Sequence, residues 1–169
     1  MTNRTVETSS TKEEFATALL GRLHAMSRAY GVLSRENWTE VSIEELVTQE
    51  AAPFDPQRFS IAGPPVKLRP QQALSLGMVM HELTTNAAKY GALSKQGGKV
   101  DIGWSVRDQC LGLAWREIDG PPIVEPKHGG FGLSLVKGEI EYRLGGTAET
   151  FFDPTGLTVS ISIPLDRKT

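Results

Sequence analysis

Apolar residues recur every three or four positions near the start of the chain, and this spacing predicts one long helix over residues 11–34. The stripe that they form consists of Phe15, Leu19, Leu23, Met26, Tyr30 and Leu33. Thr11 and Glu14 have the spacing of a capping box at the helix start. Because no second long helix of this kind follows, we expect the stripe to pack against a separate segment or a second copy of the chain.

The next part of the chain predicts short elements. Ser42 and Glu45 form a second Ser-x-x-Glu box, which opens a short helix over residues 42–50. Residues 58–62 and 66–68 have the composition of short strands, and a Gly-Pro-Pro turn separates them.

The remaining pattern predicts the fold class. A helix is expected over residues 70–90, because a proline fits its first turn and a glycine follows it. Alternating apolar residues predict strands over 100–106 and 111–117, joined by a tight turn. A helix over 131–144 and a hairpin over 147–163 follow. This order predicts an α+β fold: a long N-terminal helix, then a two-layer sandwich whose mixed, mostly antiparallel sheet carries about three helices on one face.

Composition narrows the functional classes. The 169 residues carry 18 Lys and Arg against 20 Asp and Glu, a formal charge of −2, with an isoelectric point near 5.9. This balance gives no electrostatic reason to expect nucleic acid or an anionic membrane as a partner. The longest apolar run is too short to span a bilayer and the polar N-terminus lacks a signal peptide, so we expect a cytoplasmic protein. The single Cys110 excludes an intrachain disulfide and fits a reducing compartment.

Polar residues line one side of the helix predicted over residues 70–90. Glu82, Asn86 and Lys89 recur at helical spacing, and Tyr90 follows them. A carboxylate and an amide oxygen one turn apart are ligands that Mg²⁺ takes while it keeps waters and substrate phosphates. Lys89 would then meet a phosphate. The alternative is an ordinary solvated helix face, and spacing alone favours this alternative because such helix faces are common.

A carboxylate ends the second alternating strand. Glu117 lies on the same strand face as Leu113 and Trp115, so the alternation points it toward the core. A buried carboxylate needs hydrogen-bond donors. Either it accepts a hydrogen bond from a ligand amine, such as an adenine amino group, or it already lies in water at the strand end.

Glycines open the helix predicted over residues 131–144. The segment 128–133 reads His-Gly-Gly-Phe-Gly-Leu, and free amides at a helix start form an anion site that glycine lets a phosphate approach. The alternative is a plain loop-to-helix junction. His24 is interpreted as a partly buried packing residue beside the apolar stripe, and Cys110 as a core residue rather than a nucleophile.

Several short motifs together carry a family resemblance. They are His81-Glu82-Leu83, Asn86-Ala87-Ala88-Lys89-Tyr90-Gly91-Ala92-Leu93-Ser94, Trp115-Arg116-Glu117, Gly120-Pro121-Pro122 and Gly130-Phe131-Gly132. Their order resembles the nucleotide-binding domain shared by histidine kinases, DNA gyrase, heat-shock chaperone ATPases and mismatch-repair ATPases. More narrowly, residues 13–165 resemble the HWE subfamily of sensor histidine kinases, which is named for the residue types found here at His81, Trp115 and Glu117.

The resemblance implies the ATP-binding catalytic domain of a protein histidine kinase, with ATP and Mg²⁺ as cofactors. By this reading Asn86 coordinates Mg²⁺, Glu82 orients water around the ion or polarises the acceptor, and Glu117 reads the adenine amino group. The remaining nucleotide contacts that it implies are Lys89, Tyr90, Gly120, Gly130, Phe131, Gly132 and Leu133. The parent protein would pass the phosphoryl group from a histidine to the receiver domain of a response regulator.

The resemblance also divides the chain. Residues 1–36 resemble the second helix of a dimerisation hairpin, and residues 37–169 resemble the catalytic domain, so we expect a homodimer through the N-terminal helix. The sequence has no His-Arg-x-x-Asn acceptor box, so we expect that this chain does not phosphorylate itself. Asp119 stands where the family commonly has a glycine, and a carboxylate near the phosphates would repel them.

Two other functions remain open from the sequence. One is a non-catalytic phosphotransfer or scaffold protein with a degenerate nucleotide site, although the presence of Glu82, Asn86 and Glu117 argues against such decay. The other is a serine kinase of the anti-sigma type on the same fold, against which the Trp-Arg-Glu segment and the long first helix argue.

Overall fold

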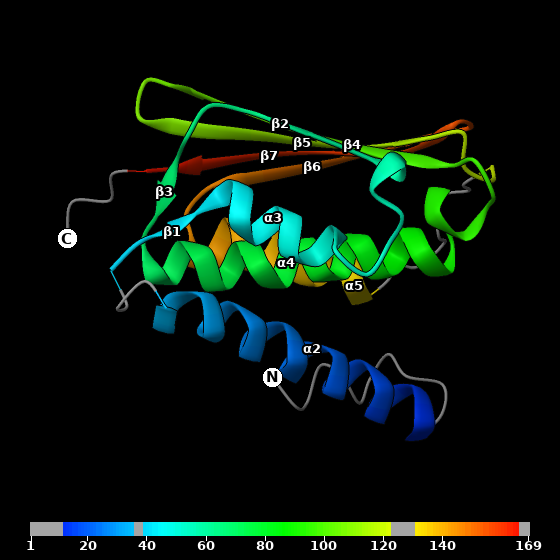
Figure 1. Ribbon diagram of the computed structural model, residues 1–169, viewed down its shortest axis with the longest axis horizontal. Coiled ribbons are helices and arrows are strands. Elements are labelled where there is room, and N and C mark those ends of the chain that lie inside the picture. The colour runs from blue at the N-terminus through cyan, green and yellow to red at the C-terminus, as the bar shows by residue number, and fades with distance from the viewer. Residues whose placement is uncertain (1–11, 36–38, 123–130, 166–169) are drawn as a thin grey trace.

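The computed structural model describes residues 12–35, 39–122 and 131–165, which form two layers and an outlying helix (Figure 1). Helices α3 (Ile43–Ala51), α4 (Pro70–Lys89) and α5 (Phe131–Lys137) cover one face of a five-stranded sheet. The long helix α2 (Lys12–Arg35) packs on the outer side of α4. The predicted sandwich with a preceding helix is confirmed. Within the described residues, no helix combines the length and apolar character that crossing a membrane requires.

The sheet is mixed and mostly antiparallel, as predicted. Its strands, in spatial order, are β2 (Phe59–Ala62), β4 (Lys99–Arg107), β5 (Cys110–Ile118), β7 (Gly156–Pro164) and β6 (Thr147–Asp153). The β2–β4 pair is parallel because α4 carries the chain back between the two strands, whereas the other three pairs are antiparallel. Two short strands, β1 (Val41–Ser42) and β3 (Lys67–Leu68), pair separately.

The turn between β4 and β5 fixes which residues face the helices. Asp108 and Gln109 have φ values of 48° and 60°, the left-handed conformation that a two-residue hairpin turn requires. The turn makes Arg107 the partner of Cys110, and the register carries through to Val100 opposite Glu117. Glu117 therefore faces the helix-covered side, as the alternation predicts.

The core lies between the sheet and the helical layer. The apolar side of α4 is buried and belongs to one hydrophobic cluster with residues of β5; fully buried members of this cluster include Leu76 and Leu83 of α4 and Leu113 and Trp115 of β5. Burying each side chain of this size contributes about 1.5–3 kcal/mol, so this layer dominates the stability of the sandwich.

The helix predicted over residues 131–144 changes its winding partway. It begins as α5 and continues as a π-helical segment, η3 (Gly138–Arg143), in which the amide of Leu144 donates to the carbonyl of Glu139 at 3.2 Å. The side chain of Glu139 is buried and accepts a 2.7 Å hydrogen bond from Ser75 Oγ on α4. Gly145, with φ of 66°, ends the helix as predicted.

Small residues form the closest approach of α2 to α4. Ala25 and Ala29 of α2 are buried, and a Cβ atom built at Gly77 would lie 3.3 Å from the Cβ of Ala29. Only small residues permit such a close approach between two helices. The stripe residues Leu23 and Tyr30 are 51% and 41% exposed, as is the neighbouring Leu20 at 54%.

Three local predictions are wrong. Ser42 is the N-cap residue of α3, but its side chain makes no capping hydrogen bond, so the box with Glu45 does not form. His24 is exposed and not partly buried. Cys110 is half-buried beside Ser162 Oγ at 3.1 Å, on the sheet face opposite Leu111, and is not a core residue. The capping box at Thr11 lies outside the described residues.

Candidate functional site

Glu82 and Asn86 lie one turn apart on α4, both partly buried. Nε of Arg22, on α2, donates to Oε1 of Glu82 at 3.0 Å. Both partners of this ion pair are largely shielded from water, with 10% and 14% of their side chains exposed. The second oxygen of Glu82 faces α5.

Gly132, in the first turn of α5, brings these two side chains to one point. A Cβ atom at this position would lie 2.8 Å from Nδ2 of Asn86 and 2.9 Å from Oε2 of Glu82. A larger residue would therefore displace the carboxylate or the amide. The missing side chain lets the backbone of α5 lie against both groups, and this close contact of Glu82, Asn86 and Gly132 is called the cradle below.

Glu117 is a buried carboxylate, only 4% exposed, at the end of β5. Its Oε2 accepts a 2.8 Å hydrogen bond from the amide of Ala92, and its Oε1 lies 3.4 Å from the indole Nε1 of Trp115. Burial raises the pKa of Glu117, while the hydrogen bonds from Ala92 and then Trp115 oppose that rise. Of the two alternatives at this residue, the strand end in open water is excluded.

Glycines allow the chain to close around Glu117 and Ala92. A Cβ atom at Gly91 would overlap the carboxylate of Glu117, and one at Gly120 would lie 2.9 Å from the Cα of Ala92. The lack of a side chain at Gly120 therefore allows the chain after β5 to pack closely against the loop after α4. Asp119, just before it, is exposed and has φ of 56°.

The other residues that the resemblance implies lie around these groups or outside the described part. Lys89 and Tyr90 end α4, and both are exposed, Tyr90 by 72%. Leu133 is partly buried and packs against the core, and Phe131 begins α5. Gly130 lies outside the described residues.

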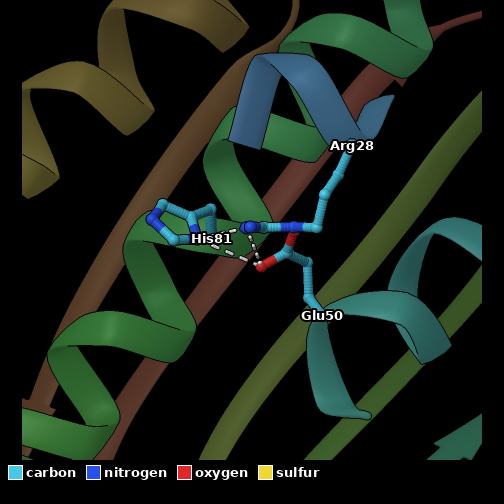
Figure 2. A network of polar contacts seen from close by, with 3 residues as sticks. All are labelled: Arg28, Glu50 and His81. Carbon is cyan, nitrogen blue, oxygen red and sulfur yellow. Dashed lines mark hydrogen bonds and ion pairs between the residues drawn. The ribbon is translucent and has the colours of Figure 1, made fainter. Parts of the chain in front are cut away.

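A second polar cluster joins three helices. Figure 2 shows Arg28 of α2, Glu50 of α3 and His81 of α4 pointing toward one another. The guanidinium of Arg28 makes two hydrogen bonds to the carboxylate of Glu50, at 3.0 and 3.1 Å. Nδ1 of His81 lies 2.9 Å from Nη2 of Arg28 and 3.1 Å from Oε2 of Glu50. Because Arg28 can only donate and ionised Glu50 can only accept, Nδ1 hydrogen-bonds one of them at a time.

Sequence reasoning missed the arginines that support these groups. Arg22 and Arg28 lie on the same side of α2 as Ala25 and Ala29, and cationic residues beside small ones at helical spacing were the available signal. Arg58 gave no such signal, because its partners are main-chain carbonyls.

The donor set at the cradle is sparse. Among the residues that the structure describes, no three His, Cys, Asp or Glu side chains converge as a metal cluster. An amide and a carboxylate beside a glycine instead suit an ion that a substrate brings with it, because Mg²⁺ in phosphate sites takes only one or two protein ligands.

Comparisons with known proteins find histidine kinases. A family model described as HWE histidine kinase matches residues 1–65. Blue-light-activated histidine kinase 1 of Erythrobacter litoralis is 36% identical over 163 residues, which cover 91% of this chain and 45% of that protein. This chain spans less than half the length of such curated relatives.

Solved structures share the fold. Erythrobacter litoralis EL346 blue-light activated histidine kinase superposes with a TM-score of 0.72 at 20% identity, over 93% of this chain and 52% of that one. Histidine kinase ThkA, solved in complex with the response regulator protein TrrA, superposes with a TM-score of 0.57 at 22% identity, over 89% and 49% of the two chains. The motifs, the fold and these matches agree: the chain is similar to histidine kinases, and its residues 1–65 match the model of the HWE family.

Proposed function

We propose that this chain binds Mg–ATP between α4 and the start of α5 and positions the γ-phosphoryl group for transfer to a histidine. The observation that carries the proposal is the cradle at Gly132, where Glu82, Asn86 and a bare stretch of backbone meet. Glycine at this point keeps the backbone of α5 close to both side chains, so that a Mg²⁺-bound phosphate at this edge would meet all three groups together.

The donors at the cradle fit Mg²⁺. The amide oxygen of Asn86 would coordinate the ion, and Glu82 would orient a bound water or polarise the acceptor. When bound, Mg²⁺ neutralises charge on the phosphates. Phosphoryl transfer requires positioning and charge neutralisation rather than covalent chemistry from the protein, and oxygen donors are sufficient for that task.

The nucleoside end would lie at Glu117. Its carboxylate would accept a hydrogen bond from the adenine amino group, and Lys89 and Tyr90 would contact phosphate and ribose from the exposed end of α4. The resemblance assigns the remaining nucleotide contacts to Gly120, Gly130, Phe131, Gly132 and Leu133.

The two parts of the chain would have different tasks. Residues 1–36 would supply the second helix of a dimerisation hairpin, and residues 37–169 the catalytic domain. The phosphoryl group would pass from a histidine to the receiver domain of a response regulator, a partner of the kind that ThkA binds. The reaction would take place in the cytoplasm, where ATP is supplied.

The exposed side of α2 supports a homodimer. Leu20, Leu23 and Tyr30 present apolar surface on the side of α2 that α4 does not cover. Contiguous apolar surface of this kind marks an interaction site.

Calorimetric titration with a non-hydrolysable ATP analogue, with and without Mg²⁺, tests the proposal. We expect Mg²⁺-assisted binding that falls at least about tenfold in Asn86→Ala and in Glu117→Ala, since each change removes a buried polar contact with the ligand.

Two control variants remove an amide or a carboxylate that lies away from the proposed site. Gln71→Ala removes an exposed amide from the first turn of α4, and Glu149→Ala removes an exposed carboxylate from β6. Both should bind like the wild-type chain. A wild-type chain that binds no nucleotide would contradict the proposal and favour a phosphotransfer or scaffold protein.

A further inference from the structure

The loop after α4 is held by a single arginine. The loop spans residues 91–98 and contains the 3-10 turn η2 (Ala92–Ser94). Arg58 ends the 3-10 turn η1 (Pro56–Arg58) and directly precedes β2. Its guanidinium donates hydrogen bonds to four main-chain carbonyls of the loop. The acceptors are the carbonyls of Gly98 at 2.8 Å, Ala92 at 3.0 Å, Leu93 at 3.2 Å and Lys95 at 2.6 Å.

Ala92 connects this arginine to the buried carboxylate. Its carbonyl accepts from Nη2 of Arg58, and its amide donates to Oε2 of Glu117 at 2.8 Å. Ala92 is fully buried, and a Cβ atom at Gly98 would overlap its carbonyl oxygen. The position of the amide therefore depends on the loop geometry that Arg58 fixes.

The amide of Ala92 affects which hydrogen bonds Glu117 can make. Burial raises the pKa of this carboxyl and the Ala92 amide lowers it, so the amide favours the ionised form. An ionised carboxylate only accepts hydrogen bonds and suits an amino group. A protonated carboxyl can also donate, and it then tolerates a keto oxygen at the same place.

We propose that Arg58 is a positioning residue that sets the nucleobase selectivity of the site, by holding Ala92 so that its amide stays on Glu117. Arg58 acts through main-chain atoms and does not touch the base. The planar guanidinium is suited to this task because it presents its donors in one fixed fork, which a lysine cannot reproduce. The inference rests on the function proposed above.

Binding of ADP and IDP to the wild-type chain and to Arg58→Lys tests this role. The two nucleotides differ at the six-position of the base, where one has an amino group and the other a keto oxygen. We expect the wild-type chain to prefer ADP by at least about tenfold, and Arg58→Lys to reduce the preference to within about twofold. Affinity for ADP should fall while affinity for IDP should not, because a carboxyl that is more often protonated can donate to the keto oxygen.

Two further variants separate this role from general support of the fold. Arg69→Lys is the matched control, since Arg69 also donates to a main-chain carbonyl, that of Leu165 at 3.0 Å, but at the other end of α4. It should keep the ADP preference. In a Glu117→Gln background, Arg58→Lys should have no further effect on the preference, because both changes act on the same carboxyl.

The outcomes distinguish the two proposals. Undiminished ADP preference in Arg58→Lys, or an additive effect in the Glu117→Gln background, would overturn the role of Arg58 and leave the nucleotide site standing. A wild-type chain that binds neither nucleotide would overturn both.

Discussion

The carboxylate of Glu117 is buried, and burial disfavours its negative charge. Because burial raises its pKa above the ordinary value of 4.5, the folded chain binds a proton here more tightly than the unfolded chain does. The contribution of this carboxyl to stability is therefore complete below about pH 4.5 and is lost as the pH rises through the folded pKa. A group that costs stability at neutral pH is typical of a functional site.

Glu117→Gln should consequently stabilise the chain without nucleotide at neutral pH. The amide oxygen can still accept from Ala92, while the buried charge is gone. We expect the melting temperature of the variant to exceed that of the wild-type chain at pH 7.5 and to match it near pH 4, where the wild-type carboxyl is protonated as well. Glu149→Gln, on the exposed side of β6, should change neither value. A lower melting temperature for Glu117→Gln at pH 7.5 would contradict this account.

Gly132 tests the cradle directly. Its replacement by alanine places a methyl group against Asn86 and Glu82, so affinity for Mg–ADP should fall at least about tenfold while the fold persists. Gly138→Ala is a control in the same helical run, because nothing lies within 4 Å of the added methyl group. Unchanged affinity in Gly132→Ala, measured by calorimetry, would place the phosphates elsewhere.

At single positions, the sequence predicts which side of a strand a side chain faces better than it predicts the groups that the side chain contacts. Strand alternation placed Glu117 toward the core, and the structure confirms this. The hydrogen bond from the Ala92 amide to Glu117 joins the loop after α4 to strand β5. The two residues are far apart in the sequence, so no local pattern predicts this hydrogen bond. His24 shows the opposite failure: its helical position was right, but which side of α2 meets α4 depends on the small residues of both helices.

Among the elements, α2 is attached to the sandwich by small residues and by two charged contacts. Close approach at Gly77 and Ala29 brings Arg22 to Glu82 and Arg28 to Glu50 and His81. The cluster in Figure 2 therefore joins the first helix to both α3 and α4. It lies beside Glu82, one residue along α4 from His81.

Arg28→Met should loosen α2 selectively. Arg28 is partly exposed, so solvent screening limits the loss to about 1 kcal/mol. Amides of α2 should then exchange about fivefold faster with deuterium, while those of β5 and β7 keep their protection. Arg116→Met, an exposed arginine on β5, is the control. Equal acceleration across α2 and the sheet would show that the cluster stabilises the whole fold and not the docking of α2.

Periodicity and glycine or proline signals located nearly every helix and strand within a residue or two. Those signals depend on residues near one another in the sequence, as do the bounds of helices and strands. The parallel pairing of β2 with β4 and the π-helical turn η3 were not predicted, because both depend on contacts between distant segments, such as Ser75 with Glu139.

For the whole molecule, the exposed apolar side of α2 determines the expected assembly. Sedimentation should show the wild-type chain as a dimer and the double variant Leu20→Glu, Leu23→Glu as a monomer, because two charges per helix would be buried at the interface. Phe151→Glu is a matched control, since Phe151 on β6 is 53% exposed. It should leave the dimer intact. A wild-type chain that remains monomeric at high concentration would remove this prediction.

Strand β2 is short and lies at one edge of the sheet, where β4 is its single sheet neighbour. Because β2 has a sheet neighbour on one side alone, we expect it to open more readily than the central strands β4, β5 and β7. Arg58 directly precedes it, and a local opening of this edge would withdraw the guanidinium from the loop after α4. The preference of the site for one base would then depend on whether β2 is paired with β4. A ligand that requires the ordered loop would in turn keep β2 paired.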